Sequence, residues 1–130
     1  MNLLIVDDSK IVRRVLSNTM TRYFKKPEWN ELNLFEAADG NEAMDIMKKE
    51  KVDIMLLDWN MPNMSGPEVV EAVRANKEWN KTRIIMATTE GSKSSVLAMI
   101  KKGANGYMVK PFQEDSIFKT LDTITARMPK

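Results

Sequence analysis

A run of four apolar residues in the middle of the chain, residues 54–57 (IMLL), constrains the fold most, and Asp58 follows it directly. An unbroken apolar run of this length is typical of a strand that is buried on both faces of a parallel sheet. Pro62 lacks a backbone donor, and Gly66 followed by Pro67 is typical of a loop that turns into a helix. Asp58 is therefore predicted to lie where a buried strand ends, which is where open α/β sheets place their binding sites.

A second strand with the same pattern begins the chain. Residues 3–6 (LLIV) are apolar and are followed by Asp7 and Asp8. Strands of a parallel sheet end at the same edge, so Asp7, Asp8 and Asp58 are predicted to converge in one shallow crevice if the two strands are neighbours. Three carboxylates this close repel one another unless a cation or a shared proton is present. A hard divalent cation is the simplest solution.

Strands and helices alternate along the rest of the chain. Further strands are predicted at residues 34–37, 83–87 and 106–109, and helices at residues 9–23, from residue 41, and at residues 66–76, 92–102 and 113–127. Strands separated by helices predict right-handed βαβ crossovers and one parallel sheet covered on both faces. The length of 130 residues fits one domain of ordinary size.

Composition excludes several classes of function. The chain has no cysteine, which excludes disulfides and thiolate metal sites, and no histidine, which excludes imidazole ligands and serine–histidine catalysis. Its net charge of +2 gives no general reason to bind nucleic acid or an anionic membrane. No apolar run approaches the roughly 20 residues that span a bilayer, and the first residues lead into aspartates instead of a signal-peptide cleavage site. We therefore expect a cytoplasmic protein that binds neither nucleic acid nor membrane.

Four motifs, each at the end of a predicted strand, together carry a resemblance. They are Asp7-Asp8, the segment DWNMPNMSG that begins at Asp58, Thr88, and Lys110-Pro111-Phe112. In this order they resemble the receiver domain of bacterial response regulators, and the similarity covers essentially the whole chain. Residues at the variable positions of the family make the chain most similar to its single-domain chemotaxis regulators: Trp59, Asn60, Glu90 and Tyr107.

This resemblance implies a flavodoxin-like α/β fold. We expect a doubly wound, five-stranded parallel sheet with the strand order 2-1-3-4-5 and helices on both faces. The acidic crevice would lie at the switch point between the first and third strands. Residues 1–130 are expected to form a single receiver domain without an output domain.

The resemblance also implies roles for the residues of the crevice. Asp58 would accept a phosphoryl group from a histidine kinase, and Lys110 would pair with the phosphoryl oxygens, with its bond to Pro111 in the cis form. Mg²⁺ prefers oxygen ligands and retains waters, which suits a site without histidine. The implied Mg²⁺ ligands are the side chains of Asp7, Asp8 and Asp58 and the backbone carbonyl of Asn60.

A switch and a partner surface follow from the same resemblance. Thr88 and Tyr107 would respond to the phosphoryl group, and the partner face would lie on helix four, strand five and helix five, with Lys93, Val96 and Tyr107 in it. Two simpler interpretations remain open. Thr88 could be a solvated loop hydroxyl, and its choice over the neighbouring Thr89 depends on the spacing from Asp58. Tyr107 could be a packing residue, because a tyrosine in a strand is more often packed than a switch.

The expected function is a phosphorylation-activated signalling switch, of chemotaxis type, that works as a monomer. Its expected partners are a histidine kinase, a flagellar motor switch protein and a phosphatase. A phosphate sink or phosphorelay shuttle would use the same residues, and a receiver-fold interaction module would not turn over phosphate. A metal-dependent phosphohydrolase would need a general acid and a substrate pocket, for which the sequence offers no candidate. No helix-turn-helix segment follows the last helix, so DNA binding is not expected.

One segment departs from the family. Residues 25–33 (KKPEWNELN) form a longer connection than is usual between the first helix and the second strand, away from the predicted crevice. The insertion could alter a partner surface on the side of the first helix. Trp29 within it is predicted to be a packed anchor, with an exposed contact as the alternative.

Overall fold

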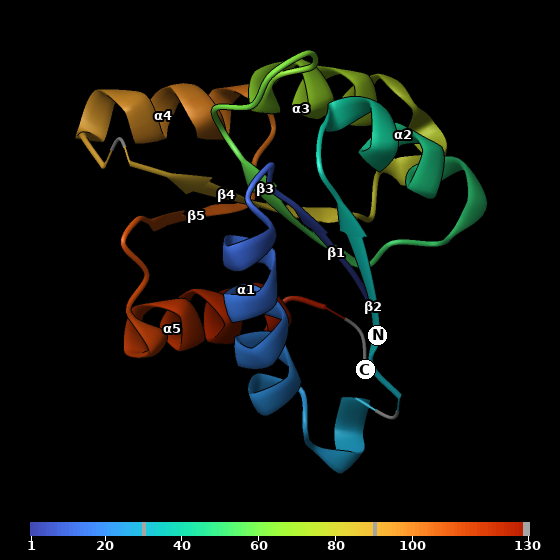
Figure 1. Cartoon of the computed structure of the whole chain (residues 1–130), viewed down its shortest axis with the longest axis vertical. Helices are drawn as coiled ribbons and strands as arrows, with labels where there is room; N and C mark the ends of the chain where they lie inside the picture. Colours follow the sequence, from blue (N-terminus) through green and yellow to red (C-terminus); the bar gives the residue numbers. More distant parts are fainter. Residues whose placement is uncertain (30, 90, 129–130) are drawn as a thin grey trace.

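The computed structural model of this chain describes residues 1–29, 31–89 and 91–128. Its centre is a five-stranded sheet with the strand order β2-β1-β3-β4-β5 (Figure 1). All four strand pairs are parallel. The predicted order and direction are therefore confirmed. The strands are β1 (Asn2–Val6), β2 (Asn33–Ala37), β3 (Ile54–Asp58), β4 (Arg83–Thr88) and β5 (Gly106–Val109).

In the described part of the chain, five α-helices cover the two faces of the sheet. They are α1 (Lys10–Tyr23), α2 (Gly40–Lys49), α3 (Gly66–Ala75), α4 (Lys93–Lys102) and α5 (Glu114–Thr125). Helices α2, α3 and α4 lie on one face, and α1 and α5 lie on the other (Figure 1). The longest of them, α1, has 14 residues. No helix in the described part of the chain combines the length and apolar character needed to cross a bilayer.

Side-chain alternation along the strands divides the core into two layers. Leu4 and Val6 of β1 pack under α2 and α3, while Leu3 and Ile5 of the same strand pack against α1 and α5. Every residue of β3 is buried. This is the environment that the unbroken apolar run predicted, because successive side chains of a strand point to opposite faces and both faces are covered.

Side-chain caps start α1, α2, α3 and α4 close to where the sequence predicts these helices. Ser9, Asp39, Ser65 and Ser92 each accept a hydrogen bond from the backbone N–H three residues further on. Such caps satisfy amides that have no partner in the first helical turn. Gly103 ends α4 with a φ of 122°, a conformation that favours glycine. The observed bounds differ from the predicted ones by one or two residues.

Trp29 anchors the long connection before β2 to the core. This connection contains a 3₁₀-helix, η1 (Pro27–Trp29), and the Trp29 side chain is buried. Its ring centroid lies 5.4 Å from that of Phe24 in an edge-to-face arrangement. The prediction that Trp29 is a packed anchor is confirmed. A second 3₁₀-helix, η2 (Lys77–Trp79), precedes β4 and has no counterpart in the sequence-based expectations.

Two helices carry apolar side chains that the core does not cover. Ile11 and Val15 on α1 are 78% and 48% exposed, and Leu97 and Ile100 on α4 are 50% and 43% exposed. Their spacing is helical, but α1 buries Leu16, Thr19, Met20 and Tyr23, and α4 buries Met99. Apolar periodicity therefore identified both helices correctly without showing which of their apolar residues are buried.

Candidate functional site

The register of the sheet brings three aspartates together. Val6 of β1 pairs with Leu57 of β3, so Asp7 and Asp58 follow on neighbouring strands. One carboxylate oxygen from each of Asp7, Asp8 and Asp58 lies within 4.8 Å of the others. Asp7 and Asp58 are buried, whereas Asp8 is exposed. The predicted convergence of these carboxylates is confirmed.

Lys110 joins the cluster from the end of β5. Its Nζ lies 3.1 Å from Asp7 Oδ2 and 3.3 Å from Asp58 Oδ1. Its backbone N–H donates to the carbonyl oxygen of Thr88 at 2.8 Å, which continues the pairing of β4 with β5. The Lys110–Pro111 peptide bond is cis, as the resemblance implies. The ammonium group therefore reaches both buried carboxylates at once.

The surroundings of Asp58 favour its protonated form. Burial raises the pKa of Asp58, and the negative charge of Asp7 raises it further. The charge of Lys110 and a hydrogen bond from the Asn60 amide act in the opposite direction and do not cancel this rise. When its carboxylates are ionised, the site therefore carries more negative charge than Lys110 can balance.

The charges of the cluster suit a divalent cation. Burial by itself lowers the pKa of Lys110, but its contacts with Asp7 and Asp58 outweigh that effect and raise the pKa overall. Lys110 is therefore charged, and it balances only one of the three carboxylates. The remaining donors are all carboxylate oxygens, which is the ligand type that hard divalent cations such as Mg²⁺ prefer. The residues present fit such an ion.

The backbone around Asp58 is held tightly from two sides. The Trp59 N–H donates to the Ala87 carbonyl oxygen at 3.0 Å, and the Gly66 N–H donates to the Trp59 carbonyl oxygen at 3.2 Å. Gly66 begins α3 directly against this segment. A Cβ atom at Gly66 would lie 2.6 Å from the Asp58 carbonyl oxygen and 2.7 Å from Trp59 Cα. Only glycine allows α3 to approach the acidic residue this closely.

Gly66→Ala should lower the free energy of unfolding by about 2 kcal/mol, because overpacking against backbone atoms costs roughly 1–3 kcal/mol. Gly106→Ala is the matched control, since the nearest atom to its added Cβ would be Ile124 Cδ1 at 3.4 Å, an ordinary contact. Urea unfolding of the two variants and the wild type measures the difference. Equal stabilities for both variants would show that the approach of α3 to Asp58 is not constrained.

Asp58→Asn should raise the free energy of unfolding at about pH 7 in the absence of divalent cations. Since folding raises the pKa of Asp58, the native state keeps a proton that the unfolded chain releases. Stability is therefore lost as the pH rises above the ordinary aspartate value of about 4. Asparagine removes the charge and can still accept from the Asn60 amide. Denaturant titrations at several pH values should show a gain that shrinks toward acid pH, and a loss of stability at neutral pH would contradict this electrostatic argument.

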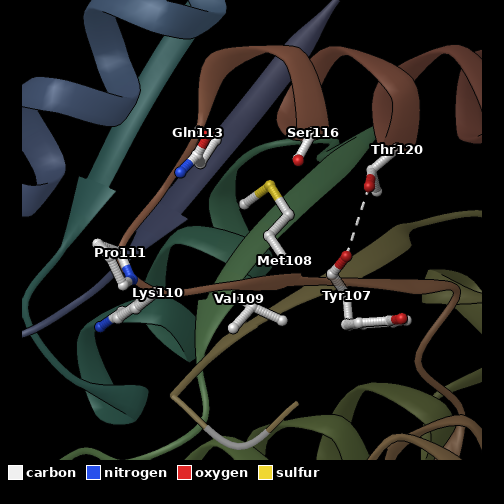
Figure 2. Close-up of a pocket in the computed structure, with 8 residues that line it drawn as sticks. All are labelled: Tyr107, Met108, Val109, Lys110, Pro111, Gln113, Ser116 and Thr120. Carbon is white, nitrogen blue, oxygen red and sulfur yellow. Dashed lines mark hydrogen bonds between the residues drawn. The ribbon is translucent and has the colours of Figure 1, made fainter.

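The predicted switch residues occupy different environments. Thr88 is the buried last residue of β4, whereas Thr89 is exposed. Tyr107 on β5 is 39% exposed, and its side chain lies on the side of the strand opposite to Met108 and α5 (Figure 2). Tyr107 is thus not a core residue, contrary to the simpler interpretation of a strand tyrosine. Glu90 lies outside the described residues.

The predicted partner face contains a surface of exposed side chains. Lys93 is exposed at the start of α4, and Val96 is half-buried one turn further on. Exposed apolar residues continue this surface over α4 and β5: Leu97, Ile100, Tyr107 and Val109. A groove of about 500 Å³ lies next to it, between β5 and α5, and Lys110, Ser116 and Thr120 contribute to its lining (Figure 2).

Two residues of the site escaped prediction from the sequence. The close approach of Gly66 to Asp58 was not foreseen, although the Gly-Pro pair correctly predicted a helix start. Arg13, in the first turns of α1, donates from Nη1 to the backbone carbonyl oxygen of Asp7 at 2.6 Å. Nothing in its spacing distinguishes it from Arg14, which is exposed.

Comparison with known proteins agrees with this fold and geometry. Residues 3–122 match the family model of the response regulator receiver domain. The chain belongs to that family.

Its relatives include chemotaxis proteins of the CheY type. The chain is 42% identical over 125 residues to a chemotaxis protein CheY homolog of Campylobacter jejuni. The aligned residues cover 95% of this chain and 92% of the relative. It is 37% identical to chemotaxis protein CheY1 of Helicobacter pylori, over 95% of this chain and 96% of the relative. The solved structure of the chemotaxis response regulator CheY4 of Vibrio cholerae superposes with a TM-score of 0.82 at 36% identity, covering 95% of this chain and 97% of that one. The chain is therefore a receiver domain of the CheY type.

Proposed function

We propose that this chain is a phosphorylation-activated response regulator of a two-component system that controls chemotaxis. Asp58 would accept the phosphoryl group from a histidine kinase. The observation that carries this proposal is the contact of Lys110 with both Asp7 and Asp58 in the cluster of three aspartates. The names of the relatives from Campylobacter jejuni and Helicobacter pylori support the chemotaxis assignment.

The phosphoryl transfer needs few protein groups. One carboxylate oxygen of Asp58 would form a bond to phosphorus while the bond from phosphorus to the donor imidazole nitrogen breaks. The electron pair of that bond would return to the imidazole. Lys110 would offset the negative charge on the phosphoryl oxygens, since positioning and charge stabilisation account for most catalysis of phosphoryl transfer. No separate substrate is expected, so the chain would not act as a conventional enzyme.

Mg²⁺ is the proposed cofactor. Asp7, Asp8 and Asp58, with the backbone carbonyl of Asn60, would hold the ion. When bound, it would neutralise charge that develops on the transferring phosphoryl group. Burial, and after it the repulsion by Asp7, raises the pKa of Asp58, and a bound cation would offset that repulsion.

Mg²⁺ should change the fluorescence of Trp59, which is next to Asp58, and should stabilise the fold by mass action because the unfolded chain has no preformed site. Asp8→Ala should remove both effects. Trp29 and Trp79 contribute background, so a Trp59→Phe variant should show the stabilisation without the fluorescence change. An unaltered Mg²⁺ titration in Asp8→Ala would exclude Asp8 from the site.

Phosphorylation of Asp58 would act on partners by changing the partner face. Thr88 would turn toward the phosphoryl group, and Tyr107 would move inward as the end of β4 shifts. The surface that includes Lys93, Val96 and Tyr107 would then change its affinity for partners. A flagellar motor switch protein and a phosphatase are the proposed partners, the cytoplasm is the proposed location, and the chain would act as a monomer.

A phosphate sink or phosphorelay shuttle is the main alternative, because it would use the same acceptor site. The exposed apolar side chains at Leu97 and Ile100 favour an output surface over a simple sink. An interaction module that never turns over phosphate would not need the contacts of Lys110 with Asp7 and Asp58.

Affinity capture of partners tests the proposed function. The protein would be held in a phosphoryl-like state by beryllofluoride and Mg²⁺ and compared with the untreated protein. Capture of a flagellar motor component only in the treated state is the expected result. Recovery of kinases alone would favour the sink and contradict the proposed output.

A further inference from the structure

Arg13 connects three elements beside the acidic crevice. Its Nη1 donates to the backbone carbonyl oxygen of Asp7 at 2.6 Å, and its Nε donates to Glu36 Oε1 on β2 at 2.9 Å. The Arg13 side chain is 15% exposed, while that of Glu36 is 49% exposed. A guanidinium with several donors in a rigid plane suits this double contact. Glu36 thus helps to hold Arg13 against the end of β1.

The three carboxylates of the crevice are held to different degrees. Asp7 accepts from the Ser9 amide at 2.8 Å and from Lys110 at 3.1 Å. Asp58 accepts from the Asn60 amide at 3.3 Å and pairs with Lys110. Within the described residues, no hydrogen bond or ion pair involves the carboxylate of Asp8. Its place in the cluster therefore depends on the backbone that carries it.

The Arg13 contact acts on that backbone. The Asp7 carbonyl and the Asp8 amide belong to one planar peptide unit, so a bond to the carbonyl oxygen restricts the orientation of the whole plane. The Asp7 N–H is also fixed, since it donates to the Ala37 carbonyl oxygen at 3.1 Å. Without Arg13, the peptide that leads into Asp8 would keep fewer restraints.

We propose that Arg13 is a positioning residue: clamped by Glu36, it orients the peptide between Asp7 and Asp8 and so presents the Asp8 carboxylate to a divalent cation. This inference rests on the proposed function, in which that cation is Mg²⁺. The positive charge of Arg13 does not account for such a role, because like charges repel and the charge alone opposes cation binding. Orientation and charge therefore predict opposite effects of removing this side chain.

Mg²⁺ titrations of Arg13→Ala and Arg14→Ala separate the two effects. Arg14 is the matched control, because it is the neighbouring arginine, is exposed, and its side chain makes no hydrogen bond or ion pair within the described part of the chain. Trp59 fluorescence should show about tenfold weaker Mg²⁺ binding in Arg13→Ala, as is common when a partner outside the ligand set is lost. Arg14→Ala should bind Mg²⁺ as tightly as wild type or more tightly.

Two further variants test the orientation directly. Arg13→Lys retains a donor and the charge and should recover part of the Mg²⁺ affinity. Glu36→Ala removes the carboxylate that accepts from Arg13 Nε but keeps the guanidinium, so it should weaken Mg²⁺ binding less than Arg13→Ala does. Thermal unfolding in EDTA and in Mg²⁺ should show that the stabilisation by Mg²⁺ is smaller in Arg13→Ala, whatever the stability of the metal-free protein.

The outcomes distinguish this inference from the proposed function. Mg²⁺ binding by Arg13→Ala that equals or exceeds that of wild type would overturn the positioning role, while Mg²⁺-dependent phosphorylation of Asp58 in wild type would still support the function. A wild-type protein that neither binds Mg²⁺ nor requires it for phosphorylation would overturn both.

Discussion

Asp58→Asn is expected to abolish phosphoryl uptake from a small phosphodonor in the presence of Mg²⁺. Among the described residues, Asp58 is the carboxylate that ends the central strand, is buried, and contacts Lys110 beside two other acids. Asparagine has nearly the same shape but lacks the negative oxygen that attacks phosphorus. Wild type should gain one phosphoryl group, which hydroxylamine removes because it cleaves acyl phosphates. Intact-mass measurement before and after treatment detects both steps.

Asp53→Asn provides the matched control for this loss. Asp53 lies directly before β3, whereas Asp58 is the last residue of that strand. The Asp53 Oδ2 atom accepts a hydrogen bond from the Asn2 backbone amide at 2.8 Å, far from Lys110 in the sheet. An asparagine oxygen can accept the same hydrogen bond. This variant should be labelled as fully as wild type. Labelling of Asp58→Asn to the same extent would show that the acceptor lies elsewhere.

Thr88→Ala should still accept phosphate but lose most of the phosphate-dependent gain in partner affinity. The phosphoryl group adds roughly −1.5 to −2 charges and new acceptor oxygens, so a nearby hydroxyl donor should be drawn toward it. Thr88 is buried at the end of β4, beside the strand that carries Asp58. Its backbone carbonyl accepts from the Lys110 amide, and this bond survives the substitution. Acceptance of phosphate should therefore be preserved while coupling to the partner face is lost.

Titration of a ligand of the α4 face, with and without beryllofluoride, measures this coupling. Coupling energies of about 1–3 kcal/mol correspond to a gain of roughly fivefold or more in wild type. We expect less than about twofold in Thr88→Ala and a full gain in Thr89→Ala, whose side chain is exposed. Val96→Asp should weaken binding in both states, because it places a charge on the partner face itself. An undiminished gain in Thr88→Ala would rule out this coupling and leave the acceptor site intact.

Much of the fold could be predicted because its signals are local. The apolar run that ends at Asp58 has the length and flanks of a buried strand, and serine and aspartate caps mark several helix starts. Exposure could not be predicted in the same way. Ile11 and Leu97 have helical spacing and apolar side chains, but whether a neighbour covers them depends on how the helices pack.

The candidate site could also be predicted only in part. Parallel strands end at one edge, so the sequence was sufficient to bring Asp7 and Asp58 together. It could not show that Asp7 is buried while Asp8 is exposed, since the two are adjacent and chemically identical. The contact of Arg13 with the Asp7 carbonyl also requires the turn between β1 and α1 to be known. Such contacts depend on tertiary geometry that spacing does not record.

Reduction of the phosphodonor-treated protein with borohydride, followed by sequencing of its peptides by mass spectrometry, tests the central claim most directly. Borohydride converts an aspartyl phosphate into homoserine and leaves free carboxylates unchanged, so it identifies the acceptor in the unaltered chain. Homoserine is expected at position 58 alone, and only after treatment with both phosphodonor and Mg²⁺. Homoserine at Asp7, Asp8 or another aspartate, with none at position 58, would contradict it.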